Sequence, residues 1–441
     1  MNSREWVARN LAVALLGGAW TPSALLRRTN EVLGRSAKPS QRALVRELLD
    51  TLPTDYPPSP GWLVAFCLRS AHFDRASASI RKSRTRLAPV LKSPCFSPIP
   101  QFADLDVPRL ATVGDLAGWL DLDVHLLEWF ADARRQHRRT AEPLLQHYAC
   151  AFAPKRSGPP RLIESPKPRL KAIQRRILRG ILDKIPVHDS AHGFVLGRSC
   201  LTSAQAHAGE ALVVALDLKD FFLRTPLRRA HGLFRSLGYP WAVARLLTGL
   251  CSTATPQSVF TSLPPEQRHD WLTRKIHESP HLPQGAPTSP SLANLAAYHL
   301  DVRLGGLAKA LDANYTRYAD DLAFSGDAAF SRRLRTFLSA VEDIVRDEGY
   351  ALNKRKTRVM RRAGRQRITG LVVNEHLNIP RPDYDRLKAT LHNCLKHGPQ
   401  AENRAGRADF RAHLEGRVVW MENVNRRRGN RLRGMFDSIA W

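Results

Sequence analysis

The residues best suited to chemistry in this chain are two adjacent aspartates, Asp320 and Asp321, which close a Tyr-Ala-Asp-Asp tetrapeptide. The residues on either side, 313–317 and 322–326, have the composition of short strands. This pattern predicts a β-hairpin that carries two carboxylates at its tip. Adjacent carboxylates repel one another unless a cation neutralises them, and hard oxygen donors suit Mg²⁺. Taken alone, the tetrapeptide leaves open a second interpretation, a solvated Asp-Asp turn.

A third carboxylate, Asp217, closes the apolar run 211–216, which predicts a buried strand with the aspartate exposed at its end. A strand-edge or helix-capping role is the alternative for this aspartate by itself. Together with Asp320, 103 positions downstream, it completes the ligand set of a two-metal site. Two Mg²⁺ about 3.5–4 Å apart in such a site activate an attacking 3′-oxygen and stabilise a leaving pyrophosphate oxygen. Asp220 is expected to be structural.

The third motif is a Pro-Gln-Gly loop within residues 281–295. Gly285 allows the backbone to come close to a ligand. The prolines are expected to fix the loop before a helix that begins near Ser289, with the serine hydroxyl as its cap and Pro290 at the first helical position. Proline-rich loops that enter helices are common, so the physical pattern alone does not identify a function.

In their order along the chain, the strand aspartate, the Pro-Gln-Gly loop and the Tyr-Ala-Asp-Asp hairpin resemble the palm of reverse transcriptases. Residues 155–166 and 170–178 resemble the fingers of bacterial reverse transcriptases. Residues 192–199 resemble the block that follows the fingers in retron and group II intron enzymes. The resemblance extends from about Val107 to the C-terminus.

Two shorter segments favour the retron branch of that family. Residues 203–207 resemble the retron signature Asn-Ala-x-x-His, with Ser203 in place of Asn. Residues 368–370 resemble the signature Val-Thr-Gly, with Ile368 in place of Val. These departures leave the polymerase assignment unchanged and bear only on the subfamily.

The resemblance implies an α+β fold of the right-hand polymerase type, with fingers, a palm built on an antiparallel sheet, and a helical thumb. We expect residues 1–106 to form a mainly helical N-terminal extension, residues 107–375 the fingers and palm, and residues 376–441 a helical, basic thumb. The basic segment 81–86 is a candidate flexible stretch. Residues 252–280, rich in Pro and Thr, are expected to be an insertion or a long loop between the palm motifs.

The resemblance also assigns roles to single residues. Asp217, Asp320 and Asp321 are expected to be the catalytic ligands of two Mg²⁺. Phe222, five positions after Asp217, would lie under the sugar of the incoming nucleotide, where its ring would exclude a 2′-hydroxyl; a core aromatic is the alternative. Lys155 and Arg161 are expected to bind the triphosphate. Gln284 and Gly285 are expected to approach the nucleotide and the template, and Lys356 is expected to contact a phosphate.

The chain of 441 residues carries a net charge of +28, which indicates a polyanionic partner such as nucleic acid. The positive charge is concentrated. Residues 354–367 contain eight Lys or Arg and no acid, and residues 155–179 contain nine against the single acid Glu164. The basic stretch near the C-terminus resembles a thumb, and the arginines expected to bind RNA there are Arg426, Arg427, Arg428 and Arg431.

None of the six cysteines lies in a Cys-x-x-Cys pair, so the sequence predicts neither a zinc site nor a disulfide framework. Reduced thiols suit a cytoplasmic protein. No apolar run approaches the roughly 20 residues that span a bilayer, so no membrane association is expected.

The resulting hypothesis is a retron-type, RNA-directed DNA polymerase that uses deoxynucleoside triphosphates and Mg²⁺. The resemblance implies a structured noncoding RNA as template and primer, and synthesis from the 2′-hydroxyl of an internal guanosine. It further implies a branched RNA–DNA product (msDNA), bound as an RNA–DNA hybrid, and a role in antiphage defence, usually with an effector protein. The alternatives are a group II intron enzyme, an abortive-infection or template-independent polymerase, and a non-catalytic RNA-binding scaffold. The last would not need three carboxylates.

Overall fold

The chain divides into two units, each built from separate stretches of sequence. The structure is a computed structural model that describes residues 3–17, 20–34, 38–52, 58, 60–82, 94–134, 142, 145–155, 159–261, 263–264 and 269–441. The first unit comprises Met1–Pro186 and Phe222–Ala296, and the second comprises Val187–Phe221 and Ala297–Trp441. Most of the basic segment 81–86 lies outside the described residues.

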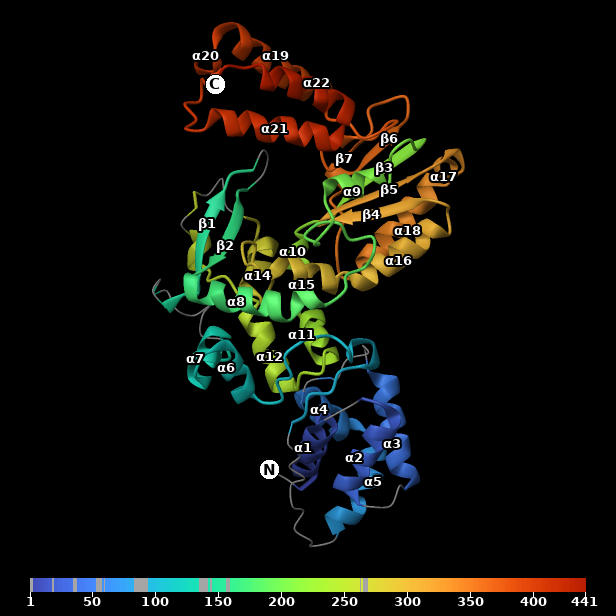
Figure 1. Cartoon of the computed structure of the whole chain (residues 1–441). Coiled ribbons are helices and arrows are strands. Elements are labelled where there is room, and N and C mark those ends of the chain that lie inside the picture. Colours follow the sequence, from blue (N-terminus) through green and yellow to red (C-terminus); the bar gives the residue numbers. More distant parts are fainter. Residues whose placement is uncertain are drawn as a thin grey trace. The chain divides into compact units, whose positions relative to one another are not determined.

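Five helices at the N-terminus of the first unit pack around a core of their own (blue in Figure 1). They are α1 (Ser3–Leu16), α2 (Pro22–Leu33), α3 (Pro39–Thr51), α4 (Pro60–Arg69) and α5 (Ala71–Lys82). Leu11, Leu25 and Phe73 are each fully buried in this core. Proline stands in the first turn of α2 and α3, where its missing N–H costs nothing because the first turn has no intrahelical acceptor for it.

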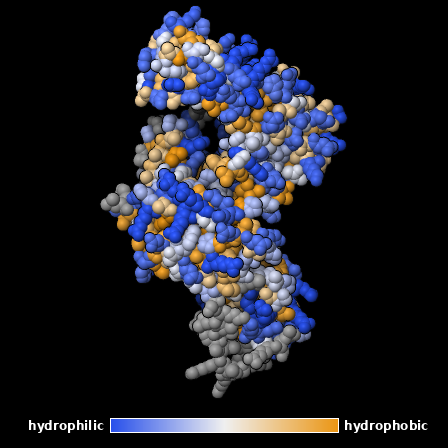
Figure 2. Space-filling view, in the orientation of Figure 1, coloured by the Kyte–Doolittle hydropathy of each residue, from blue (hydrophilic) through white to orange (hydrophobic). Residues whose placement is uncertain are grey.

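The rest of the first unit combines a two-stranded antiparallel hairpin with helices. The strands are β1 (Tyr148–Ala153) and β2 (Arg161–Pro166). The helices are η1 (Pro100–Phe102), α6 (Val113–Leu120), α7 (Val124–Phe130), α8 (Pro168–Gly180), η4 (Leu182–Lys184), α11 (Leu227–Ser236), α12 (Trp241–Leu250), α13 (Ser258–Thr261), α14 (Trp271–Glu278) and α15 (Ser289–Ala296). On α8 the apolar positions Leu170, Ile173 and Ile177 face inward, and Figure 2 shows a hydrophilic patch where this arginine-rich helix lies.

Two local expectations for this unit were wrong. Residues 252–280, expected to be an insertion or a long loop, contain the short helices α13 and α14, and Asp270 caps α14 by accepting a hydrogen bond from the Thr273 amide. Helix α15 does begin at Ser289, but the Ser289 hydroxyl donates to the Pro283 carbonyl at 2.7 Å. That serine therefore fixes the preceding loop.

The second unit is built on a four-stranded antiparallel sheet with the strand order β4-β5-β3-β6. The strands are β3 (Leu212–Asp217), β4 (Asn314–Tyr318), β5 (Asp321–Gly326) and β6 (Arg358–Arg361). Phe324 of β5 packs on Phe337, whereas its neighbour Ala323 belongs to the core formed with the C-terminal helices. Alternate residues of a strand point to opposite faces, so both faces of this sheet are covered.

Helices surround this sheet (Figure 1). They are α9 (Cys200–Gln205), α16 (Tyr298–Lys309), α17 (Ala328–Arg332), α18 (Leu334–Asp347), η6 (Lys354–Lys356), α19 (Arg381–His397), α20 (Pro399–Glu402), α21 (Phe410–Val424) and α22 (Arg426–Asp437), and a small hairpin is formed by β7 (Arg367–Ile368) and β8 (Leu371–Val372). The short helix α10 (Phe221–Arg224) stands at the boundary between the units.

The last two helices form a tight antiparallel pair because of two residues. Asn425 caps α22 by accepting a hydrogen bond from the Arg428 amide. A Cβ atom on Gly429 would lie 2.4 Å from the Cα atom of Glu422, so only glycine permits this approach of α22 to α21.

In the described part of the chain, no helix combines the length and the apolar character that crossing a bilayer requires.

Candidate active site

Strand pairing brings two of the three aspartates together. In the antiparallel register of β3 with β5, Asp217 stands opposite Asp321, and the same Asp321 pairs with Tyr318 across the hairpin. Asp320 lies in the turn between β4 and β5, and its carbonyl accepts a hydrogen bond from the Leu218 amide at 2.8 Å. The expected hairpin with carboxylates at its tip is therefore present.

One detail of the Asp217 expectation was wrong. The side chain was expected to be exposed at the end of its strand, but Asp217 is only 5% exposed. The segment that enters β6 covers it, because the Asn353 amide donates to the Asp217 carbonyl at 2.7 Å and Lys356 contacts its carboxylate. Asp321, by contrast, remains exposed at the start of β5.

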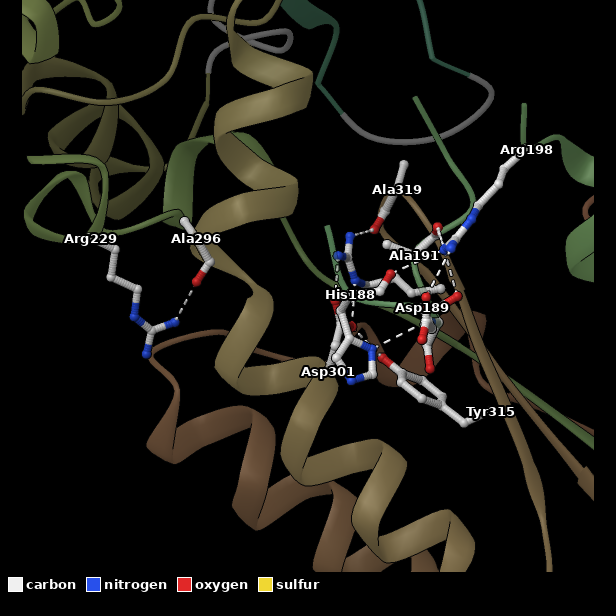
Figure 3. Close-up of polar contacts among 11 residues, drawn as sticks. His188, Asp189, Ala191, Arg198, Arg229, Ala296, Asp301, Tyr315 and Ala319 are labelled. Atoms are coloured by element: carbon white, nitrogen blue, oxygen red, sulfur yellow. Dashed lines mark hydrogen bonds and ion pairs between the residues drawn. The ribbon is translucent and has the colours of Figure 1, made fainter. Parts of the chain in front are cut away.

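The turn that carries Asp320 is held in an unusual backbone conformation. Ala319 has φ = +57°, in the left-handed region that costs about 1 kcal/mol for a residue with a side chain. Its carbonyl accepts a hydrogen bond from the guanidinium of Arg317 at 3.1 Å. Arg317 is fully buried and makes a two-pronged ion pair with Asp301 of α16, at 2.8 and 2.6 Å (Figure 3).

This buried ion pair was not foreseen from the sequence. The available signal was an arginine inside a strand and an aspartate inside an otherwise largely apolar helix, both of which need a partner when buried. The Tyr315 hydroxyl also donates to Asp301, at 2.8 Å (Figure 3). Removing one member of such a pair costs about 3–5 kcal/mol because a buried charge is left uncompensated. The pair therefore fixes the turn rigidly.

A second support for the turn comes from residues 192–199, the segment that resembles the block after the fingers in retron and group II intron enzymes. A Cβ atom on Gly193 would lie 2.5 Å from the Ala319 nitrogen, so glycine is needed for this contact. The guanidinium of Arg198 donates to the carbonyls of His188, Asp189 and Ala191 at 3.1, 2.6 and 2.8 Å, which closes the segment into a loop (Figure 3).

The two retron-like signatures also lie in this unit. His207 is fully buried, and its ring nitrogens contact Ser325 Oγ on β5 and Thr316 Oγ1 on β4, both at 2.8 Å. Ser203 Oγ lies 3.0 Å from the same Thr316 oxygen. Burial, and then the nearby charge of His192, lower the pKa of His207 to about 3. The neutral ring, two positions after the end of α9, therefore contacts both strands of the β4–β5 hairpin.

The second signature is tied to α9, the helix in which the first signature begins. The Thr369 hydroxyl donates to the Cys200 carbonyl at 3.1 Å, and Ile368 lies in the core beneath the sheet. Ser203 and Ile368, the two departures from the retron pattern, are both buried.

The electrostatics of the carboxylate cluster call for a cation. Asp321 keeps an exposed surface, but the surrounding protein still removes part of the water around its carboxyl. This desolvation, then the charges of Asp320 and Asp217, raise the pKa of Asp321 to about 6. Lys356 Nζ lies 2.7 Å from Asp217 Oδ2, and its charge lowers the pKa of Asp321. Donor atoms of the three aspartates do not all come within 4.8 Å of one another. The carboxylates are close enough for their charges to raise the pKa of Asp321, and carboxylate oxygens are the donors that Mg²⁺ prefers, so the residue types fit a divalent cation.

The expected nucleotide contacts of the first unit are placed by the β1–β2 hairpin and the Pro-Gln-Gly loop. The Glu164 amide of β2 donates to the Gln284 carbonyl at 2.9 Å. Gly285 has φ = +142°, and a Cβ atom there would lie 2.8 Å from the Glu164 carbonyl oxygen. The loop can therefore adopt this conformation only with glycine. Lys155 and Arg161 are exposed at the same end of the hairpin.

The aromatic pair on α10 separates into two environments. Phe221 is 4% exposed, with its ring 5.6 Å from the ring of Tyr350 and 5.6 Å from the guanidinium of Arg317. Phe222 is half-buried. Phe221 is therefore the core aromatic of this pair, whereas Phe222 is only half-buried.

The basic C-terminal helix has both exposed and structural arginines. Arg426, Arg427 and Arg431 are exposed on α22. Arg428 is half-buried, donates to Asn378 Oδ1 at 3.1 Å and lies 5.2 Å from the ring centre of Tyr384. Three of the four expected RNA contacts are therefore accessible, whereas Arg428 also holds α22 to α19.

Comparison with known proteins identifies the same region. A family model described as reverse transcriptase (RNA-dependent DNA polymerase) matches residues 153–384. The retron Mx65 reverse transcriptase of Myxococcus xanthus is 39% identical over 334 residues, which cover 75% of this chain and 73% of that protein. The retron Mx162 reverse transcriptase of the same organism is 42% identical over 65% of this chain and 59% of its own length. The retron Ec86 reverse transcriptase of Escherichia coli is 31% identical over 62% of this chain and 74% of its own length.

Proposed function

This chain belongs to the reverse transcriptase family and, within it, to the retron enzymes, and we propose that its RNA-directed DNA polymerase activity resides in the carboxylates of Asp217, Asp320 and Asp321. The observation that carries this proposal is the strand register that sets Asp217 opposite Asp321, with Asp320 in the adjoining turn. Aspartates more than a hundred positions apart are thereby close enough for the charges of Asp217 and Asp320 to act on Asp321.

The side chains of the cluster have separate tasks. Two Mg²⁺, when bound, would activate the primer hydroxyl and neutralise the leaving pyrophosphate. Asp321 must be deprotonated to act as a ligand, which its pKa of about 6 allows at neutral pH. The ammonium of Lys356 contacts Asp217, and it would move to a phosphate when a cation occupies the carboxylates. Arg317 and Gly193 keep the turn in place, so little reorganisation is needed during the reaction.

We further propose that the incoming deoxynucleotide contacts residues of the first unit, in the manner of polymerase fingers. Lys155 and Arg161 would bind the triphosphate, since both are cationic and exposed. The backbone at Gln284 and Gly285 would approach the nucleotide and template. Phe222 would exclude a 2′-hydroxyl. In this scheme residues 107–375 are fingers and palm, and residues 376–441 are the thumb.

The proposed partner is one structured noncoding RNA that serves as template and primer and ends as a branched RNA–DNA product. The support is the retron assignment of the relatives and the exposed arginines Arg426, Arg427 and Arg431. Phosphate contacts carry no sequence information, so selectivity for one RNA has to come from its shape and its loop bases. A role in antiphage defence with an effector protein completes the proposal.

The direct experiment is to sequence the nucleic acid that copurifies with the chain from its native host. A single structured RNA joined to DNA through a 2′–5′ branch is expected. The double variant Asp320→Asn/Asp321→Asn should carry the same RNA without DNA, because its phosphate contacts are unchanged. A heterogeneous mixture of cellular RNA on the wild-type chain would contradict the proposal of one dedicated noncoding RNA. DNA synthesis by the double variant would contradict the proposed catalytic role of the aspartates.

A further inference from the structure

A second group of metal-ligating side chains lies in the first unit. Glu164 of β2, His277 of α14 and His281 are 1%, 4% and 1% exposed. One donor atom from each lies within 4.8 Å of the others, and among the residues that the structure describes no other three such side chains converge in this way. Histidine and glutamate side chains are rarely buried without a partner for each polar atom.

Hydrogen bonds orient one ring of this group. His281 Nδ1 lies 2.7 Å from the Ser279 carbonyl oxygen, which can only accept, so Nδ1 carries a proton. The other nitrogen, Nε2, then points at Glu164 Oε2 from 2.9 Å. A neutral imidazole would set a lone pair against a carboxylate oxygen here. The two atoms therefore need either a shared proton, carried by His281 or by Glu164, or a cation that both of them coordinate.

The shared proton is the simpler possibility and has physical support. Burial lowers the pKa of His281, but the charge and hydrogen bond of Glu164 outweigh it and raise that pKa above its ordinary value. An imidazolium–carboxylate pair would account for these two residues. It would not account for the third.

His277 is the residue that favours a cation. Its Nδ1 atom is buried and has no hydrogen-bond partner in the part of the chain that the structure describes. Its ring stands at 86° to the ring of His281, with the ring centres 5.3 Å apart. A protonated His281 would repel any positive charge on His277, whereas a metal ion would use the lone pair of a neutral imidazole.

We propose that Glu164, His277 and His281 bind a transition-metal cation of the zinc class, at a site separate from the carboxylate cluster. Two imidazoles and one carboxylate suit Zn²⁺, whereas Mg²⁺ prefers oxygen donors alone. The Ser279 carbonyl on His281 and the Thr255 hydroxyl, which donates to Glu164 Oε1 at 2.7 Å, are the outer contacts that orient metal ligands.

The site would be structural, because it joins β2 to the end of α14 and to the residues that follow it, more than a hundred positions downstream. Glu164 belongs to β2, His277 to the last turn of α14, and His281 to the segment that leads to Gln284 and Gly285. The Glu164 amide also holds the Gln284 carbonyl, at 2.9 Å. A metal here would fix the Pro-Gln-Gly loop against the hairpin. The His-x₃-His spacing is a known ligand spacing, which an inspection confined to cysteines overlooks.

Elemental analysis of the full chain, expressed without a polyhistidine tag, tests the proposal. About one zinc per chain is expected for a single site of this kind, and less than about a tenth of that in His277→Gln and in His281→Gln. His392→Gln, a variant of an exposed histidine on α19, is the matched control and should keep the metal. Circular dichroism of each variant separates loss of the metal from loss of the fold.

Added Co²⁺ gives a second readout that does not depend on enzymatic activity. Metal-stripped wild-type protein should develop the visible absorption of tetrahedral Co²⁺, and His277→Gln should not. A folded wild-type chain that contains no zinc, binds neither Zn²⁺ nor Co²⁺, and shows no rise in Tm with zinc would overturn the proposal and leave the imidazolium–carboxylate pair. The Asp320→Asn/Asp321→Asn chain should bind zinc as the wild-type chain does. Failure of the zinc proposal can therefore be told apart from failure of the polymerase proposal.

Discussion

The Nζ atom of Lys356 lies 2.7 Å from Oδ2 of Asp217, so an ammonium group neutralises part of the carboxylate cluster. The two residues have different freedom to move, because the Lys356 side chain is 58% exposed and the Asp217 side chain only 7%. The lysine can therefore leave when a cation arrives, whereas the aspartate stays. The contact of Lys356 with a phosphate stays a prediction, because its partner in the structure is the Asp217 carboxylate.

The first prediction concerns this lysine. The positive charge of Lys356 favours the ionised form of Asp321, so Lys356→Met should raise the pKa of Asp321 above about 6. A protonated carboxyl is a poor ligand for Mg²⁺. The acidic limb of the pH–activity profile should move to higher pH, by about half to one pH unit at limiting Mg²⁺. Primer extension between pH 5.5 and 8.5 measures this shift.

Lys354→Met provides the matched control for that experiment. Lys354 lies two positions away in η6 and pairs with Glu342 at 2.6 Å, away from the aspartates. The Lys354→Met variant should leave the acidic limb of the pH–activity profile at the wild-type pH. Equal shifts in the two variants would mean that general surface charge, rather than the contact with Asp217, sets the profile.

The second prediction uses the sign of the Asp321 shift. The pKa of this carboxyl rises from 3.8 in the unfolded chain to about 6, so between these values the folded chain holds more protons and loses stability as pH increases. The penalty is complete above about pH 6. A shift of this size corresponds to about 3 kcal/mol without solvent screening, and the exposure of Asp321 reduces the expected penalty to about 1 kcal/mol.

Asp321→Asn should therefore stabilise the chain at pH 7.5 while abolishing DNA synthesis. A gain of about 1 kcal/mol corresponds to a rise in Tm of about 2–4 °C, measured by calorimetry without Mg²⁺. The gain should vanish at pH 4, where the carboxyl is protonated in both states. An unchanged or lower Tm at pH 7.5 would show that the three carboxylates do not destabilise one another.

The third prediction concerns His207. The folded chain protonates this ring only at about pH 3, whereas the unfolded chain does so near pH 6.5. The unfolded state thus binds more protons between these values, and stability falls as the pH is lowered through that window. His207→Asn should flatten this dependence, although it costs about 2–4 kcal/mol at pH 7 through lost packing and hydrogen bonds. Urea unfolding at pH 7.5 and at pH 4.5 compares the two slopes.

The fourth prediction tests the sugar contact. Phe222→Val should increase ribonucleotide incorporation by roughly tenfold or more, because removing the ring opens space for a 2′-hydroxyl. Single-nucleotide primer extension with paired deoxy- and ribonucleotides measures the ratio. Phe221→Val is the matched control: it removes a buried ring beside Tyr350, and should lower Tm without changing sugar selectivity. Unchanged selectivity in Phe222→Val would make that ring a packing residue.

The fifth prediction separates the arginines of α22. Replacing the exposed Arg426, Arg427 and Arg431 by Gln should weaken binding of the cognate RNA and reduce the slope of log affinity against log salt by about 2–3, with little change in Tm. Arg428→Gln should instead lower Tm, because this side chain bonds Asn378 and lies on Tyr384. The opposite pattern would place the RNA contact at Arg428.

The sequence by itself was sufficient for the family, the class of reaction and the hairpin that carries Asp320 and Asp321. Strand alternation and turn chemistry are local properties, so Asp320 and Asp321 could be assigned to a hairpin tip from ten neighbouring residues. The retron signatures and the net charge of +28 likewise depend only on residue identity and order. Local patterns failed at 252–280, where proline and threonine suggested a loop but Asp270 caps a helix.

Only the tertiary structure decided which distant residues meet. The register that sets Asp217 opposite Asp321, the burial of Arg317 on Asp301, and the convergence of Glu164 on His281 all join positions separated along the chain. Periodicity indicates which face of a strand is buried, but not which strand pairs with it or in what alignment. The arginines of α22 show the same limit of sequence patterns. Four residues of one type lie close together on this helix, and only the tertiary structure shows that Arg428 is half-buried and bonds Asn378.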